Sequence, residues 1–413
     1  MGASGISLPL AHRVTLPLVN VYVEPTGRRI APFGDAPGEI PILNRPLSAW
    51  QAEAFAGAGL TPVATRTPPC VVVPDNLFCT AGALLAFVAG AAGRDAVFVL
   101  AASRFGKGTT SVQPSVTALE AGGWRFDRVR FVSGNNAPPI DVVVDPEEQT
   151  LDLPMPNYFL GTEKLEIGIP RHPVMELNHW VHILWINQQA GSIELRNTPP
   201  WRLAMRGLWG AMRAFSLNKW KILGKLNRIG KNCDIHPTAV VEGSTLGDNV
   251  SIGAFSRVLL SRVDDGATIM SGCQVDLSVM GKGSVVSENC VLRFSVLYPE
   301  AVVSQYLMQQ CVLGRRAVTT GGSFSIDLNF DQDIRVPLDG QLWSTGSRFV
   351  GSAFGHRCRV GTGFWMASGR MVPNDAFLIR DPDQVLNRIP EELPPGPTAV
   401  IGKGVKSLGL PPA

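Results

Sequence analysis

Two histidines at helical spacing are the first residues whose types could do chemistry. His179 and His182 lie three positions apart in the segment His179-Trp-Val-His182, so both rings would project from one side of a helix and could hold a metal ion. No acidic third ligand is evident near them, and the segment is apolar. Packing of both rings in a protein core is therefore the favoured interpretation.

A short acidic loop carries a second group of polar side chains. Asp327, Asn329 and Asp331 alternate in Asp327-Leu-Asn-Phe-Asp331. Such a loop could bind an amino sugar, a cation or an arginine of a neighbouring subunit, and the arginine requires the fewest assumptions. The loop also resembles the acceptor-binding Asn-Tyr-Asp-Gly loop of the bifunctional N-acetylglucosamine-1-phosphate uridyltransferases.

The N-terminal segments resemble the signature of the sugar-1-phosphate nucleotidyltransferases. A predicted strand, 19–23, runs into Glu24-Pro-Thr-Gly-Arg-Arg-Ile-Ala-Pro-Phe33 and then Pro37-Gly-Glu-Ile-Pro-Ile-Leu-Asn-Arg-Pro-Leu47, which is similar to a loop ending GTRLxP followed by PKxLLPVxxxPL. The resemblance implies that Gly27, Arg28 and Arg29 bind nucleotide phosphates through backbone amides and positive charge.

The segment Val71-Val-Val-Pro-Asp-Asn-Leu-Phe78 resembles the strand that carries the metal ligand of the same family. The resemblance implies that Asp75 binds a catalytic Mg2+ at the carboxyl end of this strand. Two departures are visible. Glu39 stands where the family has a lysine, and Asp75 follows Arg28 by only 75 − 28 = 47 positions. A carboxylate would repel a triphosphate, so an inactive scaffold or regulatory subunit remains an alternative.

An internal repeat begins near Ile229. Aliphatic residues recur with spacings of six, six and five, and the corresponding positions Ile229, Leu246, Val263, Met280 and Leu297 are each 17 apart (246 − 229, 263 − 246, 280 − 263, 297 − 280). One coil is thus about three hexapeptides, with glycine or asparagine at corners that need positive φ. The pattern resembles that of the hexapeptide-repeat proteins, which implies a triangular left-handed parallel β-helix and a trimer or other homo-oligomer.

The coil near the end of the repeat suggests a second chemistry. Phe354-Gly-His-Arg-Cys-Arg-Val-Gly361 resembles the AHDCxVG segment of β-helix acyltransferases. The resemblance implies that His356 is a general base that activates an acceptor for attack on a thioester of acyl-CoA or acyl-carrier protein. A β-helix corner with no catalytic role is the competing interpretation and is favoured.

Composition limits the classes of partner. The chain has 413 residues, 45% of them hydrophobic and 17% charged, with a net charge of +3. This balance does not favour nucleic acid as a partner. The seven cysteines are scattered without a CxxC pair, and no secretory signal is evident at the start, so we expect a cytoplasmic protein. The apolar stretch 81–92 is too short to span a bilayer and predicts a buried helix.

The connector between the two halves is basic and aromatic. It carries no acidic residue between Arg196 and Cys233, and its helical part interleaves tryptophans with nine basic positions, which are 196, 202, 206, 213, 219, 221, 225, 228 and 231. Two interpretations are open. The connector could pack one domain on the other, which is favoured, or it could lie on an anionic membrane surface.

These observations predict two domains and three candidate functions. We expect a truncated α/β, Rossmann-like nucleotidyltransferase-like domain at 1–195, a connector at 196–228, a left-handed β-helix at 229–385 with an inserted, projecting loop at 319–342, and a proline-rich, partly disordered tail at 386–413. The leading hypothesis is a divergent sugar-nucleotide transferase of glycan or envelope metabolism that binds a sugar phosphate or nucleotide sugar. Acyl transfer on His356 and a scaffold without turnover are the alternatives.

Overall fold

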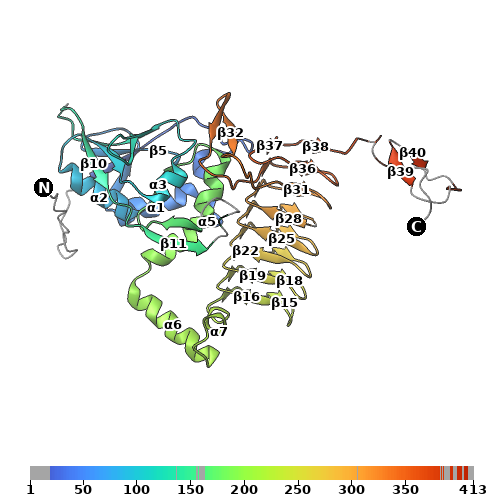
Figure 1. Cartoon of the computed structure of the whole chain (residues 1–413). Helices are drawn as coiled ribbons and strands as arrows, with labels where there is room; N and C mark the ends of the chain where they lie inside the picture. The colour runs from blue at the N-terminus through green and yellow to red at the C-terminus, as the bar shows by residue number, and fades with distance from the viewer. Residues whose placement is uncertain are drawn as a thin grey trace.

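A computed structural model describes most of the chain. It describes residues 19–381 except 136, 155–156, 158–162 and 305, and beyond these 383, 385, 391–393, 398–401 and 404–407. An α/β domain lies beside a long stack of short strands, and a pair of helices extends below the α/β domain (Figure 1). The order of the two halves follows the sequence prediction.

The α/β domain is built on one mixed sheet. Its strand order is β10-β7-β9-β5-β1-β4, with β8 (Val116–Ala118) beside β9. Neighbouring strands in this order are parallel, except that β9 is antiparallel to both β7 and β5. The path strands are β1 (Val19–Glu24), β4 (Leu60–Val63), β5 (Cys70–Pro74), β7 (Ala96–Leu100), β9 (Trp124–Val132) and β10 (Ile140–Val144).

Helices connect these strands where the sequence predicts them. The predicted helices at 47–57 and 81–92 are α1 (Leu47–Gly57) and α2 (Ala81–Ala91). The core-facing side of α2 is buried, as its apolar composition requires, and the helix packs beside strand β10. Further helices are α3 (Arg104–Thr109), α5 (Trp180–Asn197), α6 (Pro200–Ala214) and α7 (Lys219–Leu223).

Smaller strand pairs surround the main sheet. The pair β13 (Val174–Glu176) and β6 (Leu77–Cys79) is antiparallel and leads into α5. The other pairs are β2 (Pro41–Ile42) with β3 (Arg45–Pro46), and β11 (Gln149–Pro154) with β12 (Lys164–Ile169). In the tail, β39 (Thr398–Ile401) and β40 (Gly404–Ser407) form a hairpin, so part of the proline-rich segment is ordered in this structure.

The second half is a parallel β-helix, consistent with the left-handed form. The predicted register is confirmed, because Ile229 pairs with Leu246, Leu246 with Val263, Val263 with Met280, and Met280 with Leu297. One face consists of β14 (Arg228–Ile229), β17 (Thr245–Leu246), β20 (Arg262–Val263), β23 (Val279–Met280), β26 (Val296–Leu297), β29 (Val312–Leu313), β34 (Ala353–Phe354) and β37 (Met371–Val372).

Two further faces complete each coil. The second consists of β15 (Asp234–Ile235), β18 (Ser251–Ile252), β21 (Thr268–Ile269), β24 (Val285–Val286), β27 (Val302–Val303), β30 (Val318–Thr319), β35 (Arg359–Val360) and β38 (Phe377–Leu378). The third consists of β16 (Val240–Glu242), β19 (Arg257–Leu259), β22 (Gln274–Asp276), β25 (Cys290–Arg293) and β28 (Tyr306–Gln309), followed by the pair β31 (Phe324–Ser325) and β36 (Trp365–Met366).

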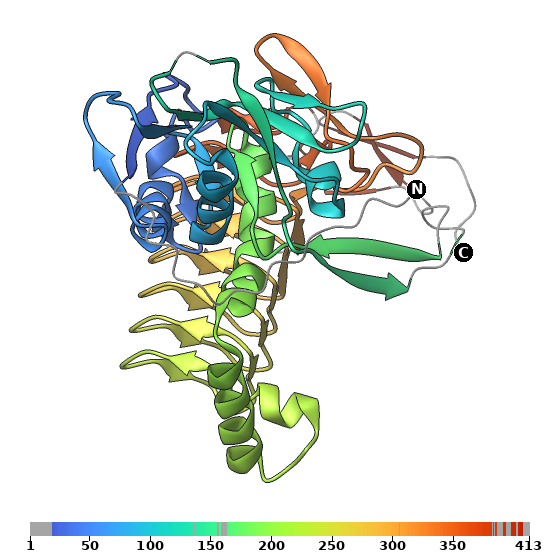
Figure 2. The same ribbon diagram turned by 90° about the vertical axis from the view of Figure 1, so that its left-hand side faces the viewer.

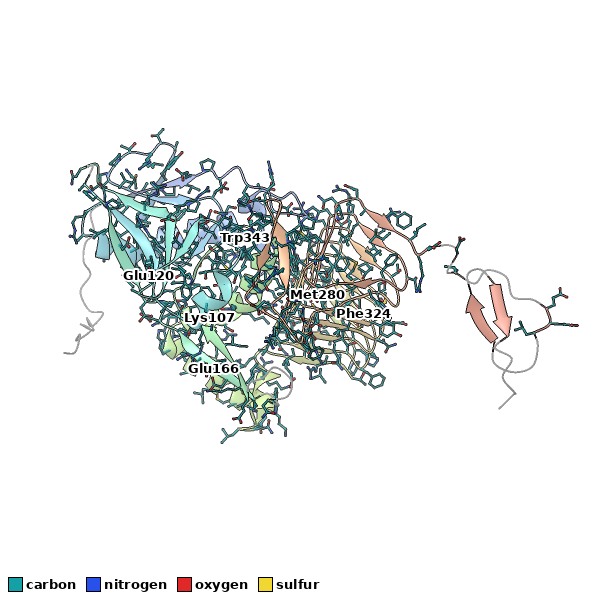
Figure 3. All side chains as sticks on the ribbon, turned by 45° about the horizontal axis from the view of Figure 1, so that its top comes forward. Lys107, Glu120, Glu166, Met280, Phe324 and Trp343 are labelled. Carbon is teal, nitrogen blue, oxygen red and sulfur yellow. The ribbon has the colours of Figure 1, made fainter. Side chains whose placement is uncertain are left out.

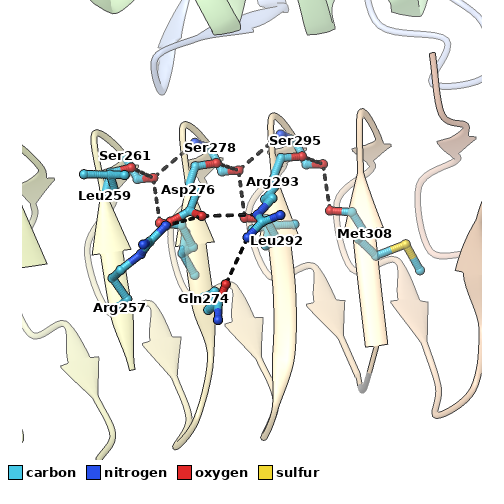
Figure 4. A network of polar contacts seen from close by, with 11 residues as sticks. Arg257, Leu259, Ser261, Gln274, Asp276, Ser278, Leu292, Arg293, Ser295 and Met308 are labelled. Carbon is cyan, nitrogen blue, oxygen red and sulfur yellow. Dashed lines mark hydrogen bonds and ion pairs between the residues drawn. The ribbon is translucent and has the colours of Figure 1, made fainter. Parts of the chain in front are cut away.

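Polar ladders support the third face (Figure 4). The backbone N–H of Ser278 donates to Oγ of Ser261, and that of Ser295 donates to Oγ of Ser278, at 3.1 and 3.2 Å. Outside this ladder the buried carboxylate of Asp276 accepts from Arg257 at 2.6 Å and from Arg293 at 3.2 Å. Each coil thereby satisfies polar groups of the next.

The insertion in the repeat leaves the β-helix and packs against the α/β domain. Its centre is a hairpin of β32 (Arg335–Leu338) and β33 (Gln341–Ser344). Val336 and Leu338 are buried in the same cluster as Trp180 of α5, and Trp343 packs against that cluster. Figure 3 labels Trp343 at this junction between the hairpin and the α/β domain. The insertion therefore covers the N-terminal domain.

Candidate functional site

The carboxyl ends of β1 and β5 form a topological switch point. The chain leaves β1 through α1 to reach β4 on one side, and it then returns to form β5 on the other side of β1. In open α/β sheets, ligands bind in the crevice outside the carboxyl ends of strands at such a point. The loop after β1 and the residues after β5 are therefore the first place to seek a binding site.

The predicted phosphate loop and Asp75 are brought together there. Thr26 donates from its hydroxyl and its backbone N–H to one carboxylate oxygen of Asp75, at 2.6 and 3.2 Å. The backbone N–H of Arg28 donates to the Thr26 hydroxyl at 3.3 Å. Gly27 sits between them at φ +66°, which favours glycine. Asp75 thus holds the loop that carries Arg28 and Arg29.

The Mg2+ expectation is not supported by this geometry. One oxygen of Asp75 is occupied by Thr26, and no group of three histidine, cysteine or carboxylate side chains that could hold a metal exists among the described residues. A hard cation such as Mg2+ needs further oxygen ligands close by. We therefore derive no step through a metal ion at Asp75.

A buried polar cluster lies directly behind this loop. Asn76, next to Asp75, donates from Nδ2 to Oδ1 of Asn178 at 2.9 Å, and the Leu177 N–H donates to the Asn76 carbonyl at 2.8 Å. Ser115 donates to one carboxylate oxygen of Glu176. Glu176 is fully buried, and Asn76, Asn178 and His179 are almost so. The pairing of β13 with β6 sets these side chains beside Asp75.

Several atoms of this cluster have no hydrogen-bond partner within the described part of the chain. By strict hydrogen-bond geometry they are Oδ1 of Asn76, Oε1 of Glu176, Nδ2 of Asn178, Nε2 of His179 and Nε1 of Trp180. The Asn178 amide nevertheless interacts with the Glu176 carboxylate, and His179 interacts with the backbone of Pro337. A buried polar atom without a partner costs about 1–3 kcal/mol, so native proteins rarely leave one unpaired. The polar groups of this cluster are therefore incompletely satisfied, above all Oδ1 of Asn76 and Nε1 of Trp180.

The charge states of this cluster follow from burial. Burial raises the pKa of Glu176, while hydrogen bonds from Ser115 and Asn178 and the charges of Arg128 and Arg28 oppose the rise. Burial lowers the pKa of His179 to about 3 and that of His182 to about 4. Both rings are neutral at pH 7. Because Nδ1 of His179 accepts from the Val181 N–H at 3.4 Å, its unpaired Nε2 carries the proton.

His182 plays a different part from His179. Its Nδ1 accepts from the N–H groups of Asn178 and His179 at 3.0 and 3.1 Å, and its Nε2 lies 2.9 Å from the Ser111 carbonyl. His182 therefore caps the start of α5 and is fully satisfied. The predicted core packing of both histidines is confirmed by their burial.

A hairpin of the β-helix covers the site. Arg28 of the phosphate loop forms an ion pair with Asp339, at the hairpin tip, with a nitrogen–oxygen distance of 3.1 Å. Pro337 of the same hairpin lies close enough to His179 to influence its pKa through the backbone. The hairpin of the β-helix thus packs over the Arg28 loop of the α/β domain.

Glu39 serves the local backbone. Its carboxylate accepts from the Ala36 N–H at 3.2 Å and caps the short 3-10 helix η1 (Pro37–Glu39). Glu39, which stands where the sugar-1-phosphate nucleotidyltransferases have a lysine, is therefore an exposed carboxylate that caps the local backbone. Nothing in its contacts suggests that it binds an anion.

His356 lies at the junction of the two domains. Its Nδ1 accepts from the Arg315 N–H at 2.8 Å, and its Nε2 lies 3.1 Å from Oδ1 of Asp35. Arg315 also binds Asp35, at 2.9 Å. Since Nδ1 is an acceptor, Nε2 carries the proton and donates to Asp35. Both nitrogens of a buried ring are engaged, so a general-base role would require Asp35 to move away.

Tyr298 encloses the same junction. Its ring lies 5.3 Å from the His356 ring and 5.1 Å from Phe33. Burial raises the pKa of Tyr298 well above its usual value, and the Asp35 carboxylate adds to the rise. The tyrosine is therefore neutral and acts as packing for the contact between His356 and Asp35.

The predicted acceptor loop lies in the insertion, and a local hydrogen bond joins two of its three residues. Asn329 Oδ1 accepts from the Asp331 N–H at 3.0 Å, and Asp331 is exposed. Asp327 is half-buried, and desolvation raises its pKa. In the described part of the chain, no hydrogen bond or ion pair joins these residues to His356. Their assignment as an acceptor site stays a prediction.

Two shallow depressions lie on the described surface away from the Arg28 loop. One of about 450 Å³ lies at the carboxyl ends of β7 and β10 and has mixed charge, because Arg104 and Lys107 face Glu147 and Glu148. The other, of about 460 Å³, lies on the β-helix and is lined by Arg316, Arg357, Arg359, Asp375, Ala376 and Phe377. No helix of the described residues is long and apolar enough to cross a membrane.

Sequence reasoning missed the importance of Glu176 and Asn178. They flank Leu177 just before the His179 pair, at the end of an apolar strand. Polar residues at the carboxyl end of a strand, followed by a helix, are a recognisable signal for a site. Their partner Asn76 is 102 positions from Asn178, and that pairing depends on the sheet topology.

Comparison with known proteins gives a limited result. No protein-family model matches the chain, and no curated protein matches it either. Among solved structures, a histidine-to-alanine variant of GDP-perosamine N-acetyltransferase from Caulobacter crescentus, in complex with coenzyme A and GDP-perosamine, is 20% identical over 37% of this chain and 51% of its own, with a TM-score of 0.15.

A hexapeptide transferase family protein from Anaplasma phagocytophilum is 15% identical over 35% of this chain and 76% of its own, with a TM-score of 0.12. Both similar structures are described as transferases. At TM-scores this low the likeness carries no conclusion about this chain. A nucleotidyltransferase fold for the α/β domain is not confirmed.

Proposed function

We propose that the α/β domain binds a sugar phosphate or nucleotide sugar at the carboxyl ends of β1 and β5, as the recognition domain of a divergent sugar-nucleotide transferase. The observation that carries the proposal is the unpaired polar cluster around Glu176 and Asn178, set behind the loop of Arg28. A sugar offers several hydroxyl groups that both donate and accept, and a phosphate offers the anion that Arg28 and Arg29 would bind.

The unpaired atoms match such a ligand in type. His179 Nε2 and Asn178 Nδ2 can donate, whereas Glu176 Oε1 and Asn76 Oδ1 can accept. Buried groups of this kind discriminate strongly against a ligand that lacks the matching hydroxyl, because they are then left unpaired. The phosphate would stay at the rim, since Arg28 is only partly buried and Arg29 is exposed.

The ligand would enter by displacing the hairpin lid. The Arg28 to Asp339 ion pair closes the rim, and Asp339 is 63% exposed. A phosphate beside Arg28 would replace this carboxylate as the partner of the guanidinium. Exposed ion pairs are worth little, so the exchange is easy. Closure of the hairpin would then exclude water from the sugar.

Calorimetric titration with sugar phosphates, nucleotide sugars and nucleoside triphosphates tests the proposal. We expect one ligand class to bind, and the double variant Arg28→Gln, Arg29→Gln to weaken it by roughly 100-fold or more, because two charge-assisted hydrogen bonds of about 1.5–3 kcal/mol each are lost. Arg45→Gln is the matched control, since Arg45 pairs with Glu53 on the surface. Equal affinities in all three proteins would refute the assignment.

Acyl transfer on the β-helix is the second candidate. The observation in its favour is the depression lined by Arg316, Arg357 and Arg359 beside Phe377, on the same coils as His356. Three guanidinium groups with an aromatic ring suit the phosphates and base of an acyl-CoA. Among the described residues Arg359 has no ion-pair partner, whereas Arg316 and Arg357 pair with Glu300 and Asp375.

Incubation with acetyl-CoA and amino-sugar acceptors, followed by thiol detection, tests this candidate. Transfer that is abolished by His356→Gln and weakened by Arg359→Gln would support it. Absence of thiol release with the acceptors that bind the α/β domain would remove it. A protein that binds the sugar ligand but shows neither reaction would be the scaffold or regulatory subunit.

A further inference from the structure

The helix α6 exposes a continuous apolar stripe that nothing in the described chain covers. Trp201, Met205, Leu208, Trp209 and Met212 recur at positions 0, 4, 7, 8 and 11 of the helix and are between 51% and 63% exposed. At 3.6 residues per turn these positions share one face. Gly210 is the only fully buried residue of α6. The favoured expectation that this connector packs one domain on the other is therefore wrong for α6.

The opposite face of α6 is the one that packs. A Cβ at Gly210 would lie 2.8 Å from Leu226 and 3.1 Å from Ile222, so α7 and the following turn approach this glycine closely. Gly210 follows Trp201 by 210 − 201 = 9 positions, or two and a half turns. The tryptophan stripe thus points directly away from the protein, and Figures 1 and 2 show α6 extended past the α/β domain near the first coils.

The stripe continues beyond the end of the helix. Phe215 is 97% exposed and Leu217 is 92% exposed in the turn to α7, and Trp220 on α7 is 52% exposed. Single exposed apolar residues are normal on a protein surface, but a contiguous set marks a contact site. Exposed apolar side chains therefore continue past the end of α6 into the turn and α7.

Basic residues flank this face without acidic partners. Arg202, Arg206 and Arg213 share the side of α6 next to the stripe, and none forms an ion pair with a described residue. Arg202 instead lies 5.1 Å from the Trp201 ring, and Lys219 lies 5.1 Å from the Trp220 ring. The segment from Arg196 to Cys233 has nine basic residues and no acid.

We propose that α6 and α7 form an interfacial anchor for an anionic lipid surface. Tryptophan, methionine and leucine would enter the boundary between headgroups and acyl chains, and the arginines would extend along it to the lipid phosphates. A second copy of the chain fits less well, because two such segments face to face would bring like charges together. The anchor would hold the protein at a membrane without spanning it, independently of the sugar site.

Co-sedimentation of the full chain with vesicles tests the anchor. We expect binding to vesicles of phosphatidylcholine with phosphatidylglycerol, and little binding to phosphatidylcholine alone. Replacing Arg202, Arg206 and Arg213 by glutamine should weaken binding by about 100-fold, since each basic residue near an anionic surface adds close to a factor of five. Trp209→Ser with Met212→Ser should also reduce it strongly. Arg359→Gln and Trp365→Ser are the matched controls on the β-helix, where Trp365 is 71% exposed.

Two results would overturn the proposal. Equal pelleting of wild type and both α6 variants would show that the stripe does not bind lipid. Alternatively, if light scattering without vesicles shows that Trp209→Ser with Met212→Ser lowers the oligomeric mass, the stripe is an interface between copies. Because these side chains are exposed, the variants should keep the thermal unfolding midpoint of the wild type, which confirms that they fold.

Discussion

His356 of the β-helix donates a hydrogen bond to Asp35 of the α/β domain across 3.1 Å, although the two residues are 321 positions apart. The same carboxylate accepts from Arg315, and the ring of Tyr298 covers the histidine. The histidine that resembles a catalytic base therefore joins two domains in this structure. The contact ties the β-helix to the α/β domain at a point remote in the sequence.

Substitution of His356 is expected to destabilise the contact between the domains. His356→Ala removes one of the two donors to the buried Oδ1 of Asp35 and leaves Arg315 as the other. Loss of a hydrogen bond to a charged group costs about 1.5–3 kcal/mol. Chemical denaturation monitored by tryptophan fluorescence measures the loss. Arg357→Ala is the control, because the neighbouring Arg357 pairs with Asp375 on the surface, and we expect little change. A His356→Ala protein as stable as wild type would show that the junction is not held by this bond.

Asp276 is expected to matter far more than Asp375 for stability. Asp276 is buried and accepts from Arg257 and Arg293 across successive coils, whereas Asp375 is exposed beside a single arginine. Asp276→Ala should lower the free energy of unfolding by about 1–3 kcal/mol because two guanidinium groups lose their partner. Equal thermal midpoints for Asp276→Ala and Asp375→Ala would contradict this account.

The stability of the α/β domain should fall in mild acid because of His182. Burial lowers its pKa from 6.5 to about 4, so between these values the unfolded chain binds a proton that the folded chain does not. The free energy of unfolding therefore decreases as pH falls from 6.5 towards 4. For this shift the decrease is about 3 kcal/mol, at roughly 1.4 kcal/mol per unit. His179, whose pKa is also lowered, acts in the same direction, and Glu176, whose pKa is raised, acts against it.

Urea unfolding across this pH range compares wild type with His182→Gln. The variant is expected to be less stable at neutral pH, because the cap of α5 is weakened, and to lose less stability on acidification. His236→Gln removes an exposed histidine and is the control, with the wild-type profile expected. A His182→Gln profile parallel to that of wild type would disprove the assignment of the acid sensitivity to His182.

The hairpin lid should respond to the loss of its ion pair. Asp339→Asn frees Arg28, so a phosphorylated ligand no longer competes with a carboxylate and should bind a few-fold more tightly, since an exposed pair contributes up to about 1 kcal/mol. Calorimetry with the ligand found in the titration measures the change. Asp333→Asn, which alters an exposed residue just before the same hairpin, is the control. Weaker binding by Asp339→Asn would mean that Asp339 contacts the ligand itself.

The β-helix could be predicted from the sequence because its signal is local and periodic. Met280 and Leu297 repeat at the spacing that the strand pairs confirm. The residues just before them, Val279 and Val296, belong to the buried cluster that contains the residues of α5. Two consecutive apolar residues in a repeat therefore mark the face of the β-helix that meets the α/β domain. The packing of the insertion on the α/β domain could not be predicted, because Val336 and Leu338 lie in a mainly polar segment.

The site was only partly predictable for a related reason. The loop of Arg28 and Asp75 could be found because each follows an apolar strand. Glu176 joins Ser115 across 61 positions, and Asn76 joins Asn178 across 102, so their proximity depends on which strands pair. Similarly, Asp35 gives no local indication that it binds His356. Long-range pairing, not residue type, decides these contacts.

A crystal structure of the protein with a bound nucleotide sugar tests the central claim most directly. We predict that the sugar hydroxyls contact Glu176, Asn178 and His179, and that a phosphate lies beside Arg28, with Asp339 displaced from it. A ligand seated instead on Arg316, Arg357 and Arg359, with only water against the polar cluster of the α/β domain, would contradict the account.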